Sequence, residues 1–194
     1  AAGNYPEEST AANLLPTPLI PRFIVCRVQL PDIYAWAGWM DRTHKDDWDR
    51  RSLAYLKHFS EDFLKLPGET ETLTNFPNPR GWTKIALLSR KIAPSHLEET
   101  LVGSLGPEVG SKLYGFIRTE IPATEELLKD PRIFGRLNVN QQYLASVLVG
   151  VDIKERFLEA KNESEKAKAV ERMIPLFKFM ETIGRDFIIL SVLS

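Results

Sequence analysis

The chain has 194 residues, of which 43% are hydrophobic and 26% charged, a composition typical of an ordered globular protein with its own hydrophobic core. Lysine and arginine together number 25 and the acidic residues 26, so the formal net charge of -1 argues against a surface built to bind nucleic acid or an anionic membrane. A single cysteine, Cys26, excludes an internal disulfide, and His44, His58 and His96 lack the spacing of metal ligands.

The first 31 residues are predicted to contain loops and one strand. Three prolines between positions 16 and 21 exclude a long helix there. The segment 23–30 (FIVCRVQL) is rich in β-branched and aromatic residues and is followed by Pro31, so we expect a strand. Cys26 lies inside this strand and is predicted to be a buried, small hydrophobic residue.

From Asp32 onward the spacing of apolar residues is helical. Asp32 is a predicted N-cap, and the apolar face of the first helix consists of Ile33, Trp36, Ala37 and Met40. The charged segment 41–49 is expected to be a solvated loop. A second amphipathic helix is predicted over residues 53–64, before Pro67. The tryptophans predicted to lie in the helical core are Trp36, Trp39 and Trp82.

Two later helix starts are marked by residues that cap helices. Asn78 followed by Pro79 predicts the first. The S-x-x-E pattern that begins at Ser95 is a capping box and predicts the second, which ends at residues 106–107 (Gly-Pro). Further helices are predicted over residues 109–117, 125–129, 141–149, 152–161 and 164–193, with Gly184 as a candidate interruption of the last.

Two segments look like nucleotide-binding motifs but lack the necessary spacing. Residues 106–112 place only three residues between two glycines, and Ser111 stands where a P-loop needs its lysine, so we predict a turn between helices. Residues 147–152 resemble a Walker B strand, but no second acid follows, and we predict ordinary core. No spacing of nucleophile, base or paired carboxylates predicts a catalytic centre in this chain by itself.

Three other segments carry motifs in a particular order: residues 1–7 (AAGNYPE), 15–23 (LPTPLIPRF) and 76–82 (FPNPRGW). They resemble "A-A-x-N-P", "L-P-P-P-L-x-x-R-F" and "F-P-T-P-R-S-W" of AAA+ ATPases of the MoxR type. In that family these are the end of the sensor 1 strand, the arginine finger and the start of the sensor 2 helix. Residues 36–39 fall where relatives have paired tryptophans, and residues 101–118 resemble the family's "G-x-V-G-x-x-x-A-x-x-F-x-x-F-x" segment.

The resemblance covers most of residues 1–135 and implies a mainly α chain. Residues 1–31 would be the C-terminal remnant of the AAA+ nucleotide-binding α/β core, with its last strand. Residues 32–135 would form a helical lid that includes sensor 2, and residues 136–194 further C-terminal helices. Walker A and Walker B would lie upstream, and the start at Ala1 suggests a chain cut from something longer.

The resemblance also implies roles for three residues. Asn4 would be the sensor 1 residue, which bonds the nucleotide and its attacking water, and Arg22 would be the finger that acts on a neighbouring subunit's site. Arg80 would be the sensor 2 arginine and would bind a phosphate; no metal ligand is predicted. From the residues alone, Asn4 also fits a turn and Arg22 a surface arginine. A cation such as Arg80 at the start of a helix is unfavourable by about 0.3–1 kcal/mol unless it meets an anion or pairs with a carboxylate.

Two departures from the family pattern concern the predicted arginines. Pro21 stands directly before Arg22 where relatives have Asp, Asn or Ser, and Gly81 follows Arg80 where they have Ser or Thr.

The function that the resemblance implies is ATP-driven remodelling or activation of a partner protein by a ring of subunits, often a hexamer. Partners of relatives frequently carry a von Willebrand A-type domain. ATP and Mg²⁺ would belong to the complete protein, and this chain alone is expected to bind neither and to be inactive. We predict a cytoplasmic location, with no nucleic-acid or membrane partner, because no apolar run reaches the roughly 18 residues of a spanning helix and no signal peptide is evident. The alternative is a non-enzymatic helical adaptor that binds other proteins.

Overall fold

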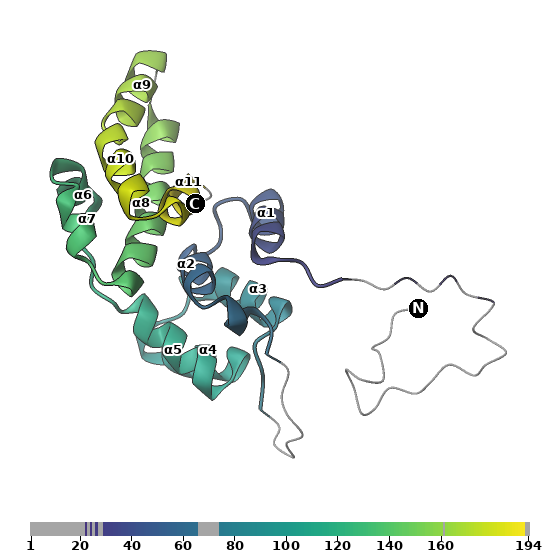
Figure 1. The fold of residues 1–194 in the computed structure, drawn as a ribbon. Helices are drawn as coiled ribbons and strands as arrows, with labels where there is room; N and C mark the ends of the chain where they lie inside the picture. The colour runs from purple at the N-terminus through teal and green to yellow at the C-terminus, as the bar shows by residue number, and fades with distance from the viewer. Residues whose placement is uncertain are drawn as a thin grey trace. The chain divides into compact units, whose positions relative to one another are not determined.

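The computed structural model describes residues 22, 24, 26, 29–65, 74–160 and 162–192. Contacts divide the chain into two compact units, Ala1–Pro31 and Asp32–Ser194. In the part of the second unit that the structure describes, all regular elements are helical (Figure 1). They are α1 (Ile33–His44), α2 (Arg51–His58), the 3-10 helix η3 (Ser60–Phe63), α3 (Pro79–Leu88), α4 (Pro94–Leu105), α5 (Pro107–Ile117), α6 (Thr124–Lys129), α7 (Arg132–Arg136), α8 (Val139–Glu159), α9 (Glu163–Glu171), α10 (Ile174–Ile183) and α11 (Arg185–Val192).

The predicted strand over residues 23–30 is not found at those of its positions that the structure describes. Ile24, Cys26, Gln29 and Leu30 have no strand conformation, and the remaining four positions lie outside the described residues. Cys26 is exposed, so its predicted burial is wrong. A strand needs a neighbour to pair its backbone N–H and C=O groups, and the composition of this segment does not provide one.

The predicted helix boundaries are confirmed where a local cap sets them. The Asp32 side chain accepts a hydrogen bond from the backbone N–H of Ala35 at 2.6 Å and begins α1. The Asn78 side chain does the same for Gly81 and begins α3. Gly106 separates α4 from α5 with φ 83°, and a Cβ there would lie 2.5 Å from the carbonyl oxygen of Asn75. Glycine is therefore required at this turn.

The capping box predicted at Ser95 is wrong. The fourth helix begins one residue earlier, with Pro94 in its first turn, and its N-cap Ala93 makes no side-chain bond. Proline at the first helical position has no N–H to leave unpaired, which makes it a sufficient start signal. Of the predicted core tryptophans, Trp36 and Trp82 are buried, whereas 42% of the Trp39 surface is exposed.

The helices after residue 136 differ from their predicted ranges. Residues 141–149 and 152–159 belong to one continuous helix, α8, because Gly150 packs closely against a neighbour and does not end the helix. Ala160 is the C-cap of α8, and position 161 lies outside the described residues. A Cβ at Gly150 would lie 2.1 Å from the carbonyl oxygen of Ser191, so α8 and α11 touch backbone to backbone. The predicted helix 164–193 is divided into α9, α10 and α11, with breaks before Ile174 and at Gly184.

Two hydrophobic cores share α8. The first core lies among α1 to α5 and includes Leu144 and Val147 of α8 and Leu190 of α11. The second lies among α6, α7, α10 and α11 and includes Ala145 and Val149. Neighbouring positions on a helix point in different directions, so α8 contributes one face to each core. Helix α8 contacts α2 and α11, and Figure 1 shows α2 near its lower half.

Candidate functional site

The three residues predicted to act on nucleotide do not fall in one described unit. Asn4 lies outside the described residues. Arg22 is exposed and belongs to the unit Ala1–Pro31. Arg80 is exposed in the first turn of α3, in the unit Asp32–Ser194. Of the three, Arg80 is the one whose neighbours along the chain are also described, so the site is built from the local geometry around it.

The chain enters α3 through a short hydrogen-bonded turn. Asn78 has an extended backbone, and its Oδ1 atom accepts the N–H of Gly81 at 2.9 Å. Its Nδ2 atom donates to the carbonyl oxygen of Phe76, also at 2.9 Å. Pro79 occupies the first helical position and fixes its own φ angle. These features set the direction of the helix start and hence of Arg80.

The two residues after Arg80 pack this first turn tightly against its neighbours. A Cβ at Gly81 would lie 3.1 Å from the carbonyl oxygen of Ser104 and 3.2 Å from Cδ2 of Leu105, at the end of α4. Trp82 is completely buried, and its indole Nε1 donates to the carbonyl oxygen of Asp62 at 2.9 Å. Glycine at position 81 thus allows α4 to approach, which is a packing reason for the departure from Ser or Thr.

Arg80 itself makes no ion pair with any residue that the structure describes. Within that part of the chain, the alternative in which Arg80 pairs with a nearby carboxylate is not observed. Pro79 has no N–H and the Gly81 N–H is bonded to Asn78, so the donors that remain here for an anion are the Arg80 guanidinium and its backbone N–H.

A buried polar group in the α1–α2 segment was not predicted. Asp49 was expected in a solvated loop, but it is 3% exposed. Its carboxylate accepts from Arg51 Nη2 at 2.6 Å and from Ser89 Oγ at 2.8 Å, and its N–H donates to the carbonyl oxygen of Ala86 at 2.7 Å. Burial alone would raise the pKa of Asp49, but the hydrogen bonds and charge of Arg51 outweigh it and hold that pKa below its usual range.

Within the segment 41–49, the burial includes Trp48 but not residues 42, 43 and 45–47, which are exposed as expected; residues 41–44 form the end of α1. Trp48 is 1% exposed, and its indole N–H donates to Asp41 Oδ1 at 3.1 Å. Arg50 pairs with Asp41 and lies over the Trp48 ring at 4.1 Å. The only sequence signal for this burial is the single tryptophan among charged residues, since a large aromatic side chain seldom stays in water without a partner.

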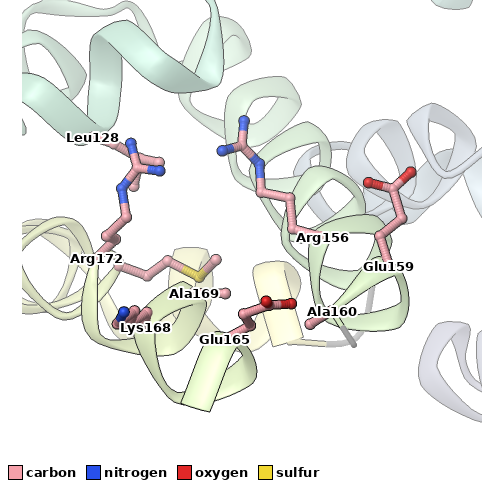
Figure 2. A pocket seen from close by; sticks show the side chains of 9 residues that line it. Leu128, Arg156, Glu159, Ala160, Glu165, Lys168, Ala169 and Arg172 are labelled. Carbon is pink, nitrogen blue, oxygen red and sulfur yellow. The ribbon is translucent and has the colours of Figure 1, made fainter. Parts of the chain in front are cut away.

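A pocket of about 440 Å³ lies between α6, α8 and α9, away from the predicted residues (Figure 2). Arg156 and Arg172 both extend toward Glu125 of α6, with N–O distances of 2.5 and 3.1 Å. Arg156 also pairs with Asp152 at 2.9 Å. The pocket is lined by Leu128, Arg156, Glu159, Ala160, Glu165, Lys168, Ala169, Arg172 and Met173. Because its arginines already bind carboxylates and its rim carries both charges, it selects no ligand class.

Comparison of the chain with known protein families, with curated proteins and with solved structures finds no match. In the described part of the chain, none of the helices has the length and apolar character to cross a bilayer. Nor do three or more histidine, cysteine, aspartate or glutamate side chains gather there as metal ligands would.

Proposed function

We propose that this chain is the C-terminal portion of a MoxR-like AAA+ ATPase, in which a cytoplasmic ring couples ATP binding and hydrolysis to remodelling or activation of a partner protein. The observation that carries the proposal is the setting of Arg80. It is exposed, has no ion-pair partner among the described residues, and stands at the start of a helix whose first turn is packed on two sides. The order of the three motifs in the sequence supports the same reading.

The physical argument concerns the cost of placing a cation there. An arginine at a helix start meets the positive end of the helix dipole, which is unfavourable by about 0.3–1 kcal/mol. A phosphate offsets that cost, because it accepts from the guanidinium and from the backbone N–H of Arg80, the donor that Pro79 and the Asn78 cap leave at this helix start. A turn whose position is fixed before the ligand arrives loses little entropy on binding. Arg80 therefore suits a nucleotide phosphate better than it suits a free surface.

Under this proposal the remaining residues have separate roles. Residues 1–31 complete the α/β core, residues 32–135 form the lid and residues 136–194 add further helices. Asn4 orients the γ-phosphate and water, and Arg22 stabilises transition-state charge in the neighbouring subunit's site. ATP and Mg²⁺ are bound by the complete protein, with Arg80 as the described residue whose chemistry fits a phosphate oxygen. The ring is a hexamer, and its partner carries a von Willebrand A-type domain.

The test compares Arg80→Ala with Lys84→Ala in the complete protein that joins this chain to its nucleotide-binding core. Lys84 is exposed on the same helix and forms no ion pair with a described residue, so it controls for the loss of a charge. A charged hydrogen bond contributes about 1.5–3 kcal/mol, so Arg80→Ala should weaken binding of a fluorescent ATP analogue roughly tenfold or more. Lys84→Ala should leave the dissociation constant unchanged.

Arg22→Ala should behave differently from Arg80→Ala. A residue that acts only on transition-state charge lowers turnover and leaves nucleotide affinity nearly intact. If Arg80→Ala and Arg22→Ala bind and hydrolyse ATP as the parent does, both are structural arginines and the sensor 2 and arginine-finger assignments are wrong. If the parent itself neither binds nor hydrolyses ATP, the ATPase assignment is wrong and the helical adaptor is the better interpretation.

A further inference from the structure

We propose that Asp62, which does not touch Arg80, is a positioning residue for it. Asp62 lies in η3 and fixes the first turn of α3 through the indole of Trp82. The inference rests on the proposed function, because it assumes that the position of Arg80 matters for binding a nucleotide phosphate.

Asp62 is a buried carboxylate with partners on three helices. Only 1% of its surface is exposed. Its side-chain Oδ2 accepts from the hydroxyl of Tyr55 in α2 at 2.6 Å, and Nζ of Lys112 in α5 lies 3.6 Å from the same oxygen. Its backbone oxygen accepts from Trp82 Nε1 in α3 at 2.9 Å. Burying a carboxylate is costly without such partners, so their arrangement fixes Asp62 itself.

The tyrosine partner is restricted in the same way. Burial raises the pKa of the Tyr55 hydroxyl, and the hydrogen bond to Asp62 raises it further, so the hydroxyl stays protonated and keeps donating. The Tyr55 ring also packs against the Trp82 ring, with 5.5 Å between their centroids, and edge-on against Phe116 at 5.6 Å. The carboxylate of Asp62 is thus fixed by Tyr55, and the backbone oxygen of Asp62 fixes the indole of Trp82.

The link from Trp82 to Arg80 is short. Trp82 follows Arg80 by two residues in the same helical turn, and its indole is completely buried. Its hydrogen bond to Asp62 sets the rotation of α3 about its own axis, because a buried indole N–H without an acceptor is unfavourable and favours a shift of the ring. Such a shift turns Arg80 with it. A misplacement of about 1 Å in a binding or catalytic group can cost up to about 100-fold in rate.

The test measures the affinity of the complete protein for a fluorescent ATP analogue in a double-mutant cycle. Asp62→Ala removes the carboxylate, and Trp82→Phe removes only the indole N–H while keeping a buried ring. Each is made alone and together with Arg80→Ala. We expect each single variant to weaken binding about threefold to tenfold, and neither to weaken it further once Arg80 is absent.

Trp48→Phe serves as the matched control. Its indole is also buried and donates to an aspartate, Asp41, but it lies outside the first turn of α3. It should lower the melting temperature to a similar extent as Trp82→Phe without changing nucleotide affinity. If Trp82→Phe does not fold, Tyr55→Phe replaces it in the cycle. This variant removes the hydroxyl that donates to the Asp62 carboxylate.

The outcomes separate the two proposals. If the parent binds no ATP analogue, the proposed function is wrong and this inference falls with it; if the parent binds it and Arg80→Ala has no effect on affinity, the phosphate-binding role of Arg80 is wrong and this inference falls with that role. If Arg80→Ala weakens binding but Asp62→Ala and Trp82→Phe do not, or weaken it equally with and without Arg80, the positioning role of Asp62 is overturned while the proposed function stands. The same holds if Trp48→Phe weakens binding as much as Trp82→Phe.

Discussion

Replacing Gly110 by alanine should destabilise the protein, whereas the same change at Gly115 in the same helix, α5, should not. A Cβ at Gly110 would lie 2.5 Å from both Cα and N of Val102 and 2.7 Å from the carbonyl carbon of Leu101. Ordinary contacts between such atoms are about 3.5–4.0 Å, so α4 and α5 would have to separate by roughly 1 Å. The atoms in the way are backbone atoms, which cannot rotate aside as a side chain can.

The expected magnitude follows from two opposing effects. Overpacking costs about 1–3 kcal/mol and more where backbone must move, while alanine gains about 1 kcal/mol over glycine inside a helix. For Gly110→Ala we expect a net loss of about 2 kcal/mol in the free energy of unfolding, or about 4–8 °C in melting temperature for a chain of this size. Gly115 has no atom within 4 Å of its would-be Cβ, so Gly115→Ala should gain about 0.5–1 kcal/mol.

Urea unfolding of the 194-residue chain, followed by circular dichroism at the helical bands, measures both values under one set of conditions. Gly103 of α4 provides a second open position, since its would-be Cβ also meets nothing within 4 Å. An unfolding free energy for Gly110→Ala equal to that of Gly103→Ala and Gly115→Ala would refute the close crossing of α4 and α5.

Three further predictions concern packing and titration. Gly150→Ala should lower the melting temperature, because its Cβ would lie 2.1 Å from the carbonyl oxygen of Ser191. A melting temperature equal to that of the parent in scanning calorimetry would contradict the α8–α11 contact. Burial lowers the pKa of His58, so as pH falls the unfolded chain takes up the proton before the folded chain does. The free energy of unfolding should therefore fall as pH drops below about 6.5. His58→Phe should make the free energy of unfolding depend less on pH in urea titrations between pH 5 and 7. Asp49→Asn should lower the free energy of unfolding by about 2 kcal/mol near neutral pH. Because the pKa of Asp49 is lowered, this loss should shrink as pH falls through that lowered pKa. An acid titration in which parent and variant differ by a constant free energy of unfolding would show that the bond from Arg51 does not depend on the charge of Asp49.

The sequence predicts the helices best where the decisive contact is local. Asp32 and Asn78 each bond a backbone N–H three residues later, so the sequence pattern contains the whole interaction. Burial of Asp49 depends instead on Ser89, which lies 40 positions later in the chain. The predicted break at positions 150–151 is wrong for a similar reason, because Gly150 packs against Ser191, 41 positions later in the chain.

The same distinction applies to the candidate site. The position of Arg80 in the first helical turn follows from Asn78 and Pro79 and could be predicted. The acceptor of the Trp82 indole could not, because Asp62 lies 20 residues earlier. The apolar spacing predicts one helix over residues 53–64, where the structure has α2 and the separate 3-10 helix η3. Sequence reasoning therefore locates the arginine but does not identify the residues that fix its direction.

The two ends of α3 are fixed by separate polar contacts, and this limits how Arg80 can move. At the start, the Trp82 indole is bonded to Asp62 of η3. At the end, the carbonyl of Ala86 accepts from Asp49, whose carboxylate also accepts from the Ser89 hydroxyl. Both contacts belong to the core of α1 to α5, so α3 cannot tilt alone without breaking buried hydrogen bonds, each worth about 1 kcal/mol or more when left unpaired. Under the proposed function, a nucleotide-dependent movement of Arg80 then requires that the whole α1–α5 core turn as one body, which is the way a lid would carry the arginine toward a phosphate or away from it.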